Sequence, residues 1–161
     1  MKVLIVDDEQ PARERLRQIL DDEPDYEVIG EAANGHEALE VASHTHPDIV
    51  LLDIRMPGME GIEAAHHLNE MDPPPAVVFT TAYDEYAVRA FDAEAVDYIL
   101  KPVEPKRLQR ALDRVAKRSR EDAAARLEAV LERLRGERHP PRVAARACGG
   151  GARTWRRAGR G

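Results

Sequence analysis

The sequence has little cysteine and few aromatic residues, and it contains no long apolar run. One cysteine among 161 residues excludes a disulfide framework and a zinc site built from several cysteines, and it suits a reducing compartment. With 1 Trp, 4 Tyr and 2 Phe, the core must be filled mainly by Val, Leu, Ile and Ala. No stretch approaches the roughly 18 apolar residues of a membrane-spanning helix, and the first apolar run is too short for a signal peptide. We therefore expect a soluble, cytoplasmic protein that does not enter a membrane.

Charge is divided unevenly along the chain. Residues 1–104 contain 7 basic and 24 acidic residues, a net charge of −17, whereas residues 105–161 contain 17 basic and 6 acidic residues, a net charge of +11. An acidic half followed by a basic tail is typical of two functional regions, one of which meets a polyanion. The alternative is an acidic fold followed by a solvated helix.

Short apolar runs alternate with helical patterns over the first hundred residues. The runs cover residues 2–6, 26–31, 48–52, 76–80 and 96–100, and their length predicts strands buried on both faces of a parallel sheet. Pro11 suits the first turn of a helix, and Asn34 can cap the next one. The alternation predicts an α/β fold: a (βα)5 flavodoxin-like, doubly wound parallel sheet with strand order 2-1-3-4-5. We place this domain at residues 1–118.

The last two predicted helices of the domain each have an apolar face. In the fourth, the pattern groups Ala87, Val88 and Phe91. The fifth begins near Glu104–Pro105, and its inward face is formed by Leu108, Ala111, Leu112 and Val115.

Two further segments follow the predicted domain. Residues 119–137 favour a helical linker, with an apolar stripe of Leu127, Val130, Leu131 and Leu134. A stripe of this kind favours a short coiled coil or a signalling linker, and a solvated helix is the alternative. Residues 138–161 hold five of the ten glycines in their last 13 positions, so we expect a disordered basic tail.

Reactive side chains follow the predicted strands where each one ends. They are Asp7, Asp8 and Glu9 after the first strand, Asp53 after the third, Thr80 and Thr81 at the end of the fourth, and Lys101 after the fifth. Because ligands of an open parallel sheet lie beyond the carboxyl ends of its strands, we expect these groups to meet at one edge. Crowded carboxylates repel one another unless a hard cation neutralises them, and Mg²⁺ accepts carboxylates while keeping a position for a phosphoryl oxygen. An aspartate in such a site can form an aspartyl phosphate.

The segments VLIVDDE, DIVLLDIRMPGMEG, TTA and YILKP resemble, in order and spacing, the receiver domain of two-component response regulators. The resemblance implies that Asp53 is the phospho-acceptor and that Asp8 is a direct Mg²⁺ ligand. It also implies that Asp7 acts largely through metal-bound water and that the backbone carbonyl of Arg55 is a further ligand. The implied donor of the phosphoryl group is a sensor histidine kinase.

The same resemblance assigns a switch. Thr81 is the hydroxyl that moves toward the phosphoryl group, Lys101 is its charge partner, and Tyr98 is the aromatic residue that turns inward. Thr80 competes with Thr81 for the hydroxyl role, but Thr80 can instead point into the sheet packing. The peptide between Lys101 and Pro102 is expected to be cis in this family, and Gly58 suits a turn with positive φ.

The segment TTAYDEYAVRAFDAEAVDYILKPVEPKRL is similar to receivers of the LytTR class. The resemblance implies a homodimer through the fourth helix, fifth strand and fifth helix, and control of transcription by a DNA-binding domain of about 100 residues. Too little sequence follows residue 137 for such a domain, so DNA binding is expected only where the full-length protein has one. For residues 138–161, a native tail, a truncated effector domain and a shifted reading frame all stay open.

Other functions are weaker. The expected protein is a signalling switch and not an enzyme, because it assists its own phosphorylation and turns over no external substrate. An aspartyl-phosphate hydrolase is disfavoured, because such an enzyme would need an Asp as general acid where Arg55 stands. The turn after the first strand has no GxGxxG, which excludes dinucleotide binding. A stand-alone receiver acting through protein contacts and weak, sequence-independent nucleic-acid binding by the basic tail are the alternatives. The histidine pairs His44/His46 and His66/His67 are expected on solvated surfaces.

Overall fold

The computed structural model describes residues 1–138. Strands and helices alternate along them, with one 3₁₀ turn before the fourth helix. The elements are β1 (Lys2–Val6), α1 (Gln10–Asp21), β2 (Glu27–Ala32), α2 (Gly35–Thr45), β3 (Ile49–Leu52), α3 (Gly61–Asn69), β4 (Ala76–Thr81), the 3₁₀ turn (Asp84–Tyr86), α4 (Ala87–Asp92), β5 (Asp97–Leu100) and α5 (Pro105–Arg138).

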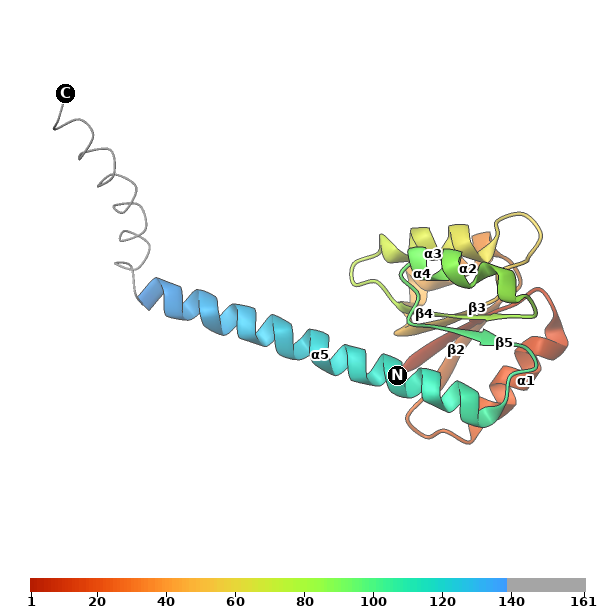
Figure 1. The fold of residues 1–161 in the computed structure, drawn as a ribbon, viewed down its shortest axis with the longest axis horizontal. Coiled ribbons are helices and arrows are strands. Elements are labelled where there is room, and N and C mark those ends of the chain that lie inside the picture. The colour runs from red at the N-terminus through yellow and green to blue at the C-terminus, as the bar shows by residue number, and fades with distance from the viewer. Residues whose placement is uncertain (139–161) are drawn as a thin grey trace, which may run out of the picture. The chain divides into compact units, whose positions relative to one another are not determined.

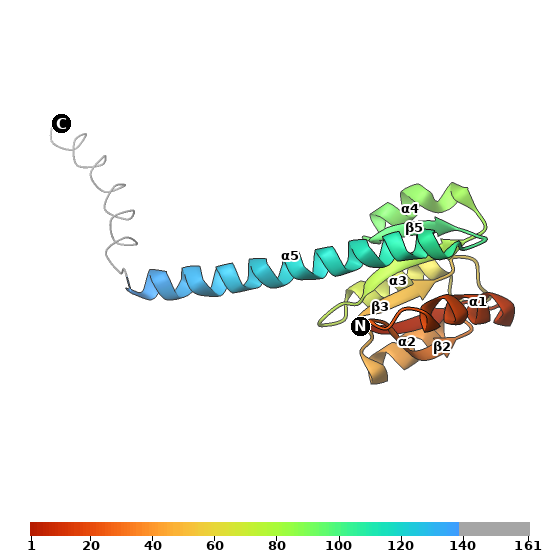
Figure 2. The same cartoon turned by 90° about the horizontal axis from the view of Figure 1, so that it is seen from below.

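The five strands form one parallel sheet in the order β2-β1-β3-β4-β5. The predicted fold and strand order are therefore confirmed. Because the chain moves outward from β1 in one direction to β2 and in the other to β3, the sheet has a switch point beyond the carboxyl ends of β1 and β3. Figures 1 and 2 show the helices on both faces of this sheet.

Two apolar layers enclose the sheet. Leu4 and Val6 of β1 pack with residues of α2, α3 and α4 on one face, whereas Val3 and Ile5 pack with α1 and α5 on the other. All four side chains are fully buried. Alternate residues of a strand point to opposite faces, which explains why the central strands are continuously apolar.

The helix starts follow local sequence signals. Pro11 lies in the first turn of α1, where its missing N–H costs no hydrogen bond. The Asn34 side chain accepts a 2.8 Å hydrogen bond from the backbone N–H of Glu37 and caps α2. Both predictions are confirmed.

The fourth helix differs from its prediction. Ala90 and Ala93 face the core, whereas Phe91, predicted on the apolar face, is 82% exposed. The side chain of Val88 lies outside the described part of the structure. The α-helix begins at Ala87, after the 3₁₀ turn, and has six residues. Neighbouring residues of a helix are about 100° apart around its axis, so a helix that buries Ala90 turns Phe91 away from the core.

The fifth helix runs without a break from Pro105 to Arg138. Leu108, Ala111, Leu112 and Val115 are buried as predicted. The structure divides into two units, with the second beginning at Arg118, and within that second unit the stripe is 40–60% exposed at Leu127, Val130, Leu131 and Leu134. None of the described helices is long and apolar enough to span a membrane. Apart from Arg138, the predicted basic tail lies outside the described residues.

Candidate functional site

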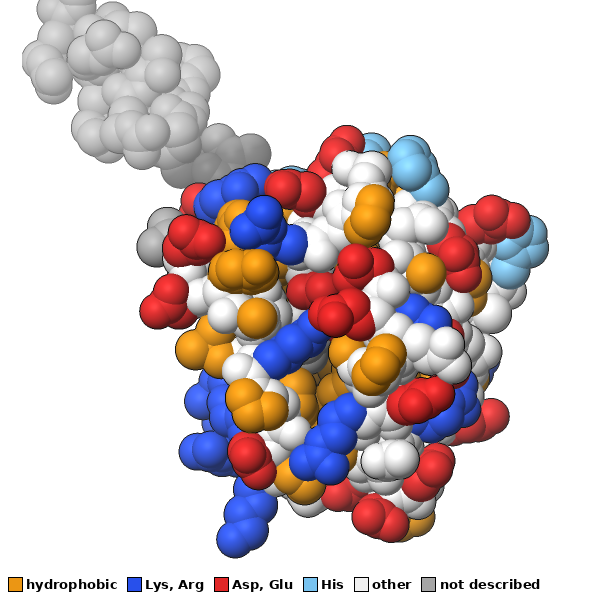
Figure 3. Space-filling view, turned by 90° about the vertical axis from the view of Figure 1, so that its right-hand side faces the viewer, with side chains coloured by type: hydrophobic (Ala, Val, Ile, Leu, Met, Phe, Trp, Pro, Cys, Tyr) orange, Lys and Arg blue, Asp and Glu red, His pale blue; other side chains and the backbone are white. Residues whose placement is uncertain are grey.

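The carboxyl ends of four strands place the predicted site residues at one edge of the sheet. Asp7 directly follows β1, Asp53 follows β3, Thr81 ends β4, and Lys101 follows β5. Asp7 and Thr81 are fully buried and Asp53 is 5% exposed, whereas Asp8 faces solvent. Figure 3 shows acidic side chains gathered near the centre of one face of the molecule, beside basic ones.

The three aspartates form a compact carboxylate group. One oxygen each from Asp7, Asp8 and Asp53 lies within 4.8 Å of the others. Ligands on opposite sides of one Mg²⁺ ion lie about 4.2 Å apart, so three oxygens that lie within 4.8 Å of one another are close enough together to approach one ion. Carboxylate oxygens are the donors that Mg²⁺ prefers, and the exposed Asp8 leaves room for water ligands. The residues therefore fit a magnesium ion.

Lys101 is the cation of this group. Its Nζ donates a 2.6 Å hydrogen bond to Oδ2 of Asp7 and lies 3.6 Å from Oδ2 of Asp53. Burial alone would lower the pKa of the ammonium, but the hydrogen bond to Asp7 and the two carboxylate charges raise it above its ordinary value. Three ionised carboxylates and one ammonium leave two negative charges, which a divalent cation would balance.

Asp53 is the most strongly perturbed group at the edge. Burial raises its pKa from 3.8 to about 6, and the negative charges of Asp7 and Asp8 act in the same direction. The Lys101 ammonium and a 2.8 Å hydrogen bond from the backbone N–H of Ile54 oppose this rise. Without metal, the Asp53 carboxyl therefore changes charge at a pH of about 6.

The backbone of Tyr83 connects the two predicted switch residues. Its N–H donates a 3.3 Å hydrogen bond to Oγ1 of Thr81, and its carbonyl accepts a hydrogen bond from the Tyr98 hydroxyl. Thr80 is buried, and its hydroxyl has no partner among the described residues. The structure thus joins Thr81, rather than Thr80, to Tyr98.

The loop after Asp53 is held tightly. Gly58 has φ of 79°, as its turn position predicts. A Cβ added to Gly61 would lie 2.0 Å from the carbonyl oxygen of Asp53, so only glycine permits this close approach of α3.

Two further predictions concern the backbone of Arg55 and of Lys101. The Arg55 guanidinium lies 4.7 Å from the centre of the Tyr83 ring, and the role of the Arg55 carbonyl as a ligand stays a prediction. The peptide between Lys101 and Pro102 is cis.

Residues 3–113 match the family described as "Response regulator receiver domain". The chain belongs to the response regulator receiver family. The receiver is 48% identical over 126 residues to the positive alginate biosynthesis regulatory protein of Pseudomonas aeruginosa, covering 78% of this chain and 51% of that one. It is 46% identical over 117 residues to the sensory transduction protein LytT of Bacillus cereus, covering 73% and 48% respectively. These relatives confirm the resemblance to LytTR-class receivers.

Among solved structures, the response regulatory domain of protein mrkE from Klebsiella pneumoniae has a TM-score of 0.69 and 34% identity. The match covers 75% of this chain and 99% of that one. The chain spans about half the length of the curated relatives it matches. The comparison therefore reaches the receiver and not the remaining half of those proteins.

Sequence reasoning missed the residues that support the site from a distance. The Tyr83 N–H donates to the Thr81 hydroxyl, Gly61 approaches the Asp53 backbone, and Arg13 donates to the Asp7 carbonyl. Gly61 carried a signal, because glycine is a poor choice within a helix and stands at the start of α3. Arg13 and Tyr83 carried none, since their contacts depend on how separate elements pack.

Proposed function

We propose that this receiver accepts a phosphoryl group on Asp53 from a sensor histidine kinase in a Mg²⁺-dependent reaction. The observation that supports it best is the buried Asp53 carboxylate, 3.6 Å from the Lys101 ammonium and grouped with two further aspartates. A structural ion pair would not need a group of three carboxylates, two of them beside one ammonium. An acceptor that must hold a cation and a phosphoryl group does.

The chain's own residues divide the work. An oxygen of ionised Asp53 attacks phosphorus, and the bond from phosphorus to the donor breaks while the leaving group keeps the electron pair. Asp8, Asp53, Asp7 through water and the Arg55 carbonyl would hold Mg²⁺, which supplies charge neutralisation for the phosphoryl oxygens. Lys101 offers an ammonium to one of those oxygens. Because the receiver is itself the acceptor, we assign it no turnover of an external substrate.

The contacts of Tyr98 indicate how phosphorylation would change the surface formed by α4, β5 and α5. When Thr81 moves toward the phosphoryl group, its bond to the Tyr83 backbone changes, and this alters the partner of the Tyr98 hydroxyl. Tyr98 lies in β5, next to a surface that exposes Phe91 of α4 and Leu100 of β5 at 82% and 47%. We propose that the α4-β5-α5 surface forms a homodimer after phosphorylation. In the whole protein this would control transcription through a DNA-binding domain, as in the LytTR class.

The proposal is tested by incubating the receiver with acetyl phosphate, with and without Mg²⁺, and measuring its intact mass. The expected result is one added phosphoryl group that requires Mg²⁺ and is absent from Asp53→Asn. Asp48→Asn is the matched control, because Asp48 lies just before β3, at the opposite end of the same strand from Asp53. Equal labelling of wild type and Asp53→Asn would overturn the proposal.

A further inference from the structure

We infer that Arg13 is a positioning residue for the metal site, holding the peptide between Asp7 and Asp8. The inference rests on the proposed function, because it concerns how the same site is kept ready for Mg²⁺. Arg13 lies in α1 and is not itself a metal ligand. It acts through the backbone of the segment that carries Asp7 and Asp8.

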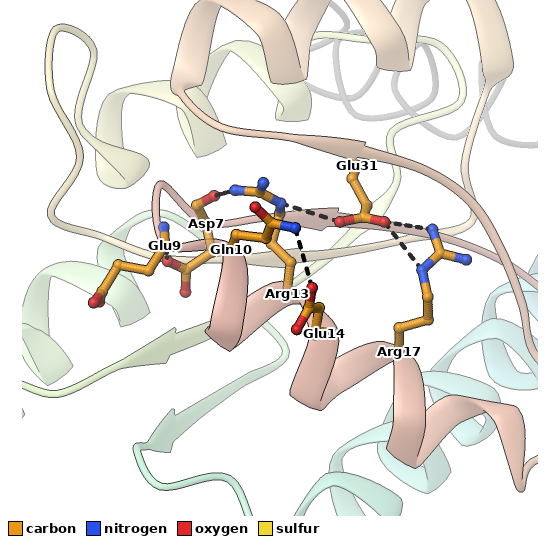
Figure 4. A network of polar contacts seen from close by, with 7 residues as sticks. All are labelled: Asp7, Glu9, Gln10, Arg13, Glu14, Arg17 and Glu31. Atoms are coloured by element: carbon orange, nitrogen blue, oxygen red, sulfur yellow. Dashed lines mark hydrogen bonds and ion pairs between the residues drawn. The ribbon is translucent and has the colours of Figure 1, made fainter.

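The Arg13 guanidinium binds two acceptors from two elements. One terminal nitrogen donates a 2.6 Å hydrogen bond to the backbone carbonyl of Asp7, and Nε donates a 3.0 Å hydrogen bond to Oε1 of Glu31 in β2. Figure 4 shows the guanidinium between these two oxygens. The Arg13 side chain is 17% exposed, so water competes little for either bond.

The bond to Asp7 acts on the peptide that leads into Asp8. The carbonyl of Asp7 and the N–H of Asp8 belong to one planar unit, so fixing the carbonyl fixes the direction of both. The Asp7 carboxylate is held separately, by Lys101 at 2.6 Å and by the N–H of Glu9 at 2.9 Å. Asp8 is exposed, and the direction of its carboxylate therefore depends on the backbone that Arg13 holds.

Glu31 keeps the guanidinium in place. It accepts from Arg13 on one oxygen, while Arg17 binds its other oxygen at 2.6 Å and 3.0 Å. These arginines hold the pKa of Glu31 below its ordinary value, with Arg17 contributing most. Within the described residues, Arg17 shares Glu31 but makes no contact with Asp7. Arg17 is thus a matched control: same helix, same charge, same partner, no link to the site.

Positioning and simple electrostatics predict opposite results. Removing a positive charge near three carboxylates should strengthen Mg²⁺ binding if charge alone matters. If Arg13 positions Asp8, its removal should weaken binding, because partners that orient ligands typically contribute about tenfold or more to metal affinity.

The experiment compares Arg13→Gln, Arg17→Gln and wild type by amide NMR, first without metal and then during Mg²⁺ titration. For Arg13→Gln we expect a shifted Asp8 amide resonance without metal and a dissociation constant for Mg²⁺ about tenfold higher. Arg17→Gln should leave the Asp8 amide resonance unshifted and the dissociation constant for Mg²⁺ within about twofold of wild type, as for an exposed pair. If Arg13→Gln does not fold, Arg13→Lys replaces it: it keeps the charge but not the two-pronged geometry, and should also bind Mg²⁺ more weakly.

Mg²⁺ affinity in Arg13→Gln or Arg13→Lys equal to or above that of wild type would overturn the inference. An equal loss in Arg17→Gln would also overturn it, because that loss would reflect α1 packing. The outcome stays separate from the proposed function: wild type that binds Mg²⁺ but takes no phosphoryl group contradicts the function and not the positioning.

Discussion

Replacing Asp53 by Asn should stabilise the metal-free receiver at neutral pH. Asp53 is 5% exposed, and its burial together with neighbouring negative charges raises its pKa from 3.8 to about 6. Asn has nearly the same shape, and its oxygen can still accept the hydrogen bond from the N–H of Ile54. The substitution therefore removes a buried charge while keeping the local packing.

The size and sign of the effect follow from the pKa. Because the folded protein binds the Asp53 proton more tightly than the unfolded chain, stability from this group falls as pH rises from about 4 to about 6. A difference of one pKa unit corresponds to about 1.4 kcal/mol, so ionised Asp53 lowers the free energy of unfolding by about 3 kcal/mol at pH 7. Asp53→Asn should be more stable by about 2–3 kcal/mol at pH 7.5 and nearly equal to wild type at pH 4.

The assay is urea unfolding of both proteins in chelator-treated buffer across this pH range. Plotting the difference in free energy of unfolding between the two proteins cancels the other titrating groups. A difference that stays flat between pH 4 and pH 7.5, or a variant that is less stable at pH 7.5, would refute the reasoning. Adding Mg²⁺ should stabilise wild type more than Asp53→Asn and narrow the gap, because the ion then balances the Asp53 charge.

Three further substitutions test the site. Asp8→Asn should weaken Mg²⁺ binding by calorimetric titration without lowering metal-free stability, because one repelling carboxylate is lost; unchanged binding contradicts the ligand role. Lys101→Ala should bind Mg²⁺ at least as strongly as wild type, because a competing positive charge is lost, but its free energy of unfolding should fall by about 3 kcal/mol, since the buried Asp7 loses its cation. Its phosphorylated form should stay monomeric in sedimentation, and wild-type dimerisation would remove Lys101 from the switch. Gly61→Ala should cost about 2 kcal/mol or more in thermal unfolding, because its Cβ would lie 2.0 Å from the Asp53 carbonyl; a neutral result would show that α3 yields.

The acidic edge could be predicted from the sequence because two local signals combine. Each apolar run indicates a buried strand, and parallel strands bring their carboxyl ends to the same edge. Asp7, Asp53 and Lys101 therefore had to meet once the topology was known, although they are far apart along the chain.

Contacts that depend on tertiary packing could not be predicted in this way. In the sequence, nothing distinguishes Arg13 from any other arginine on a helix. Only the packing of α1 against β2 brings its guanidinium to Glu31 and to the Asp7 carbonyl. The Phe91 prediction was wrong because α4 buries Ala90, and the next residue of a helix lies about 100° further around its axis. The segment predicted as a helical linker, residues 119–137, is helical and continues α5 without a break, since no glycine or proline interrupts residues 106–135.

The most direct test of the central claim is to locate the phosphoryl group on the chain. Borohydride reduces an aspartyl phosphate to homoserine, which peptide mass spectrometry can assign to one residue. After Mg²⁺ and acetyl phosphate treatment, the account predicts homoserine at residue 53 and at no other aspartate, and none in a sample without Mg²⁺. Homoserine at residue 7 or 8, or an unmodified Asp53 in a protein that has gained a phosphoryl group, would contradict it.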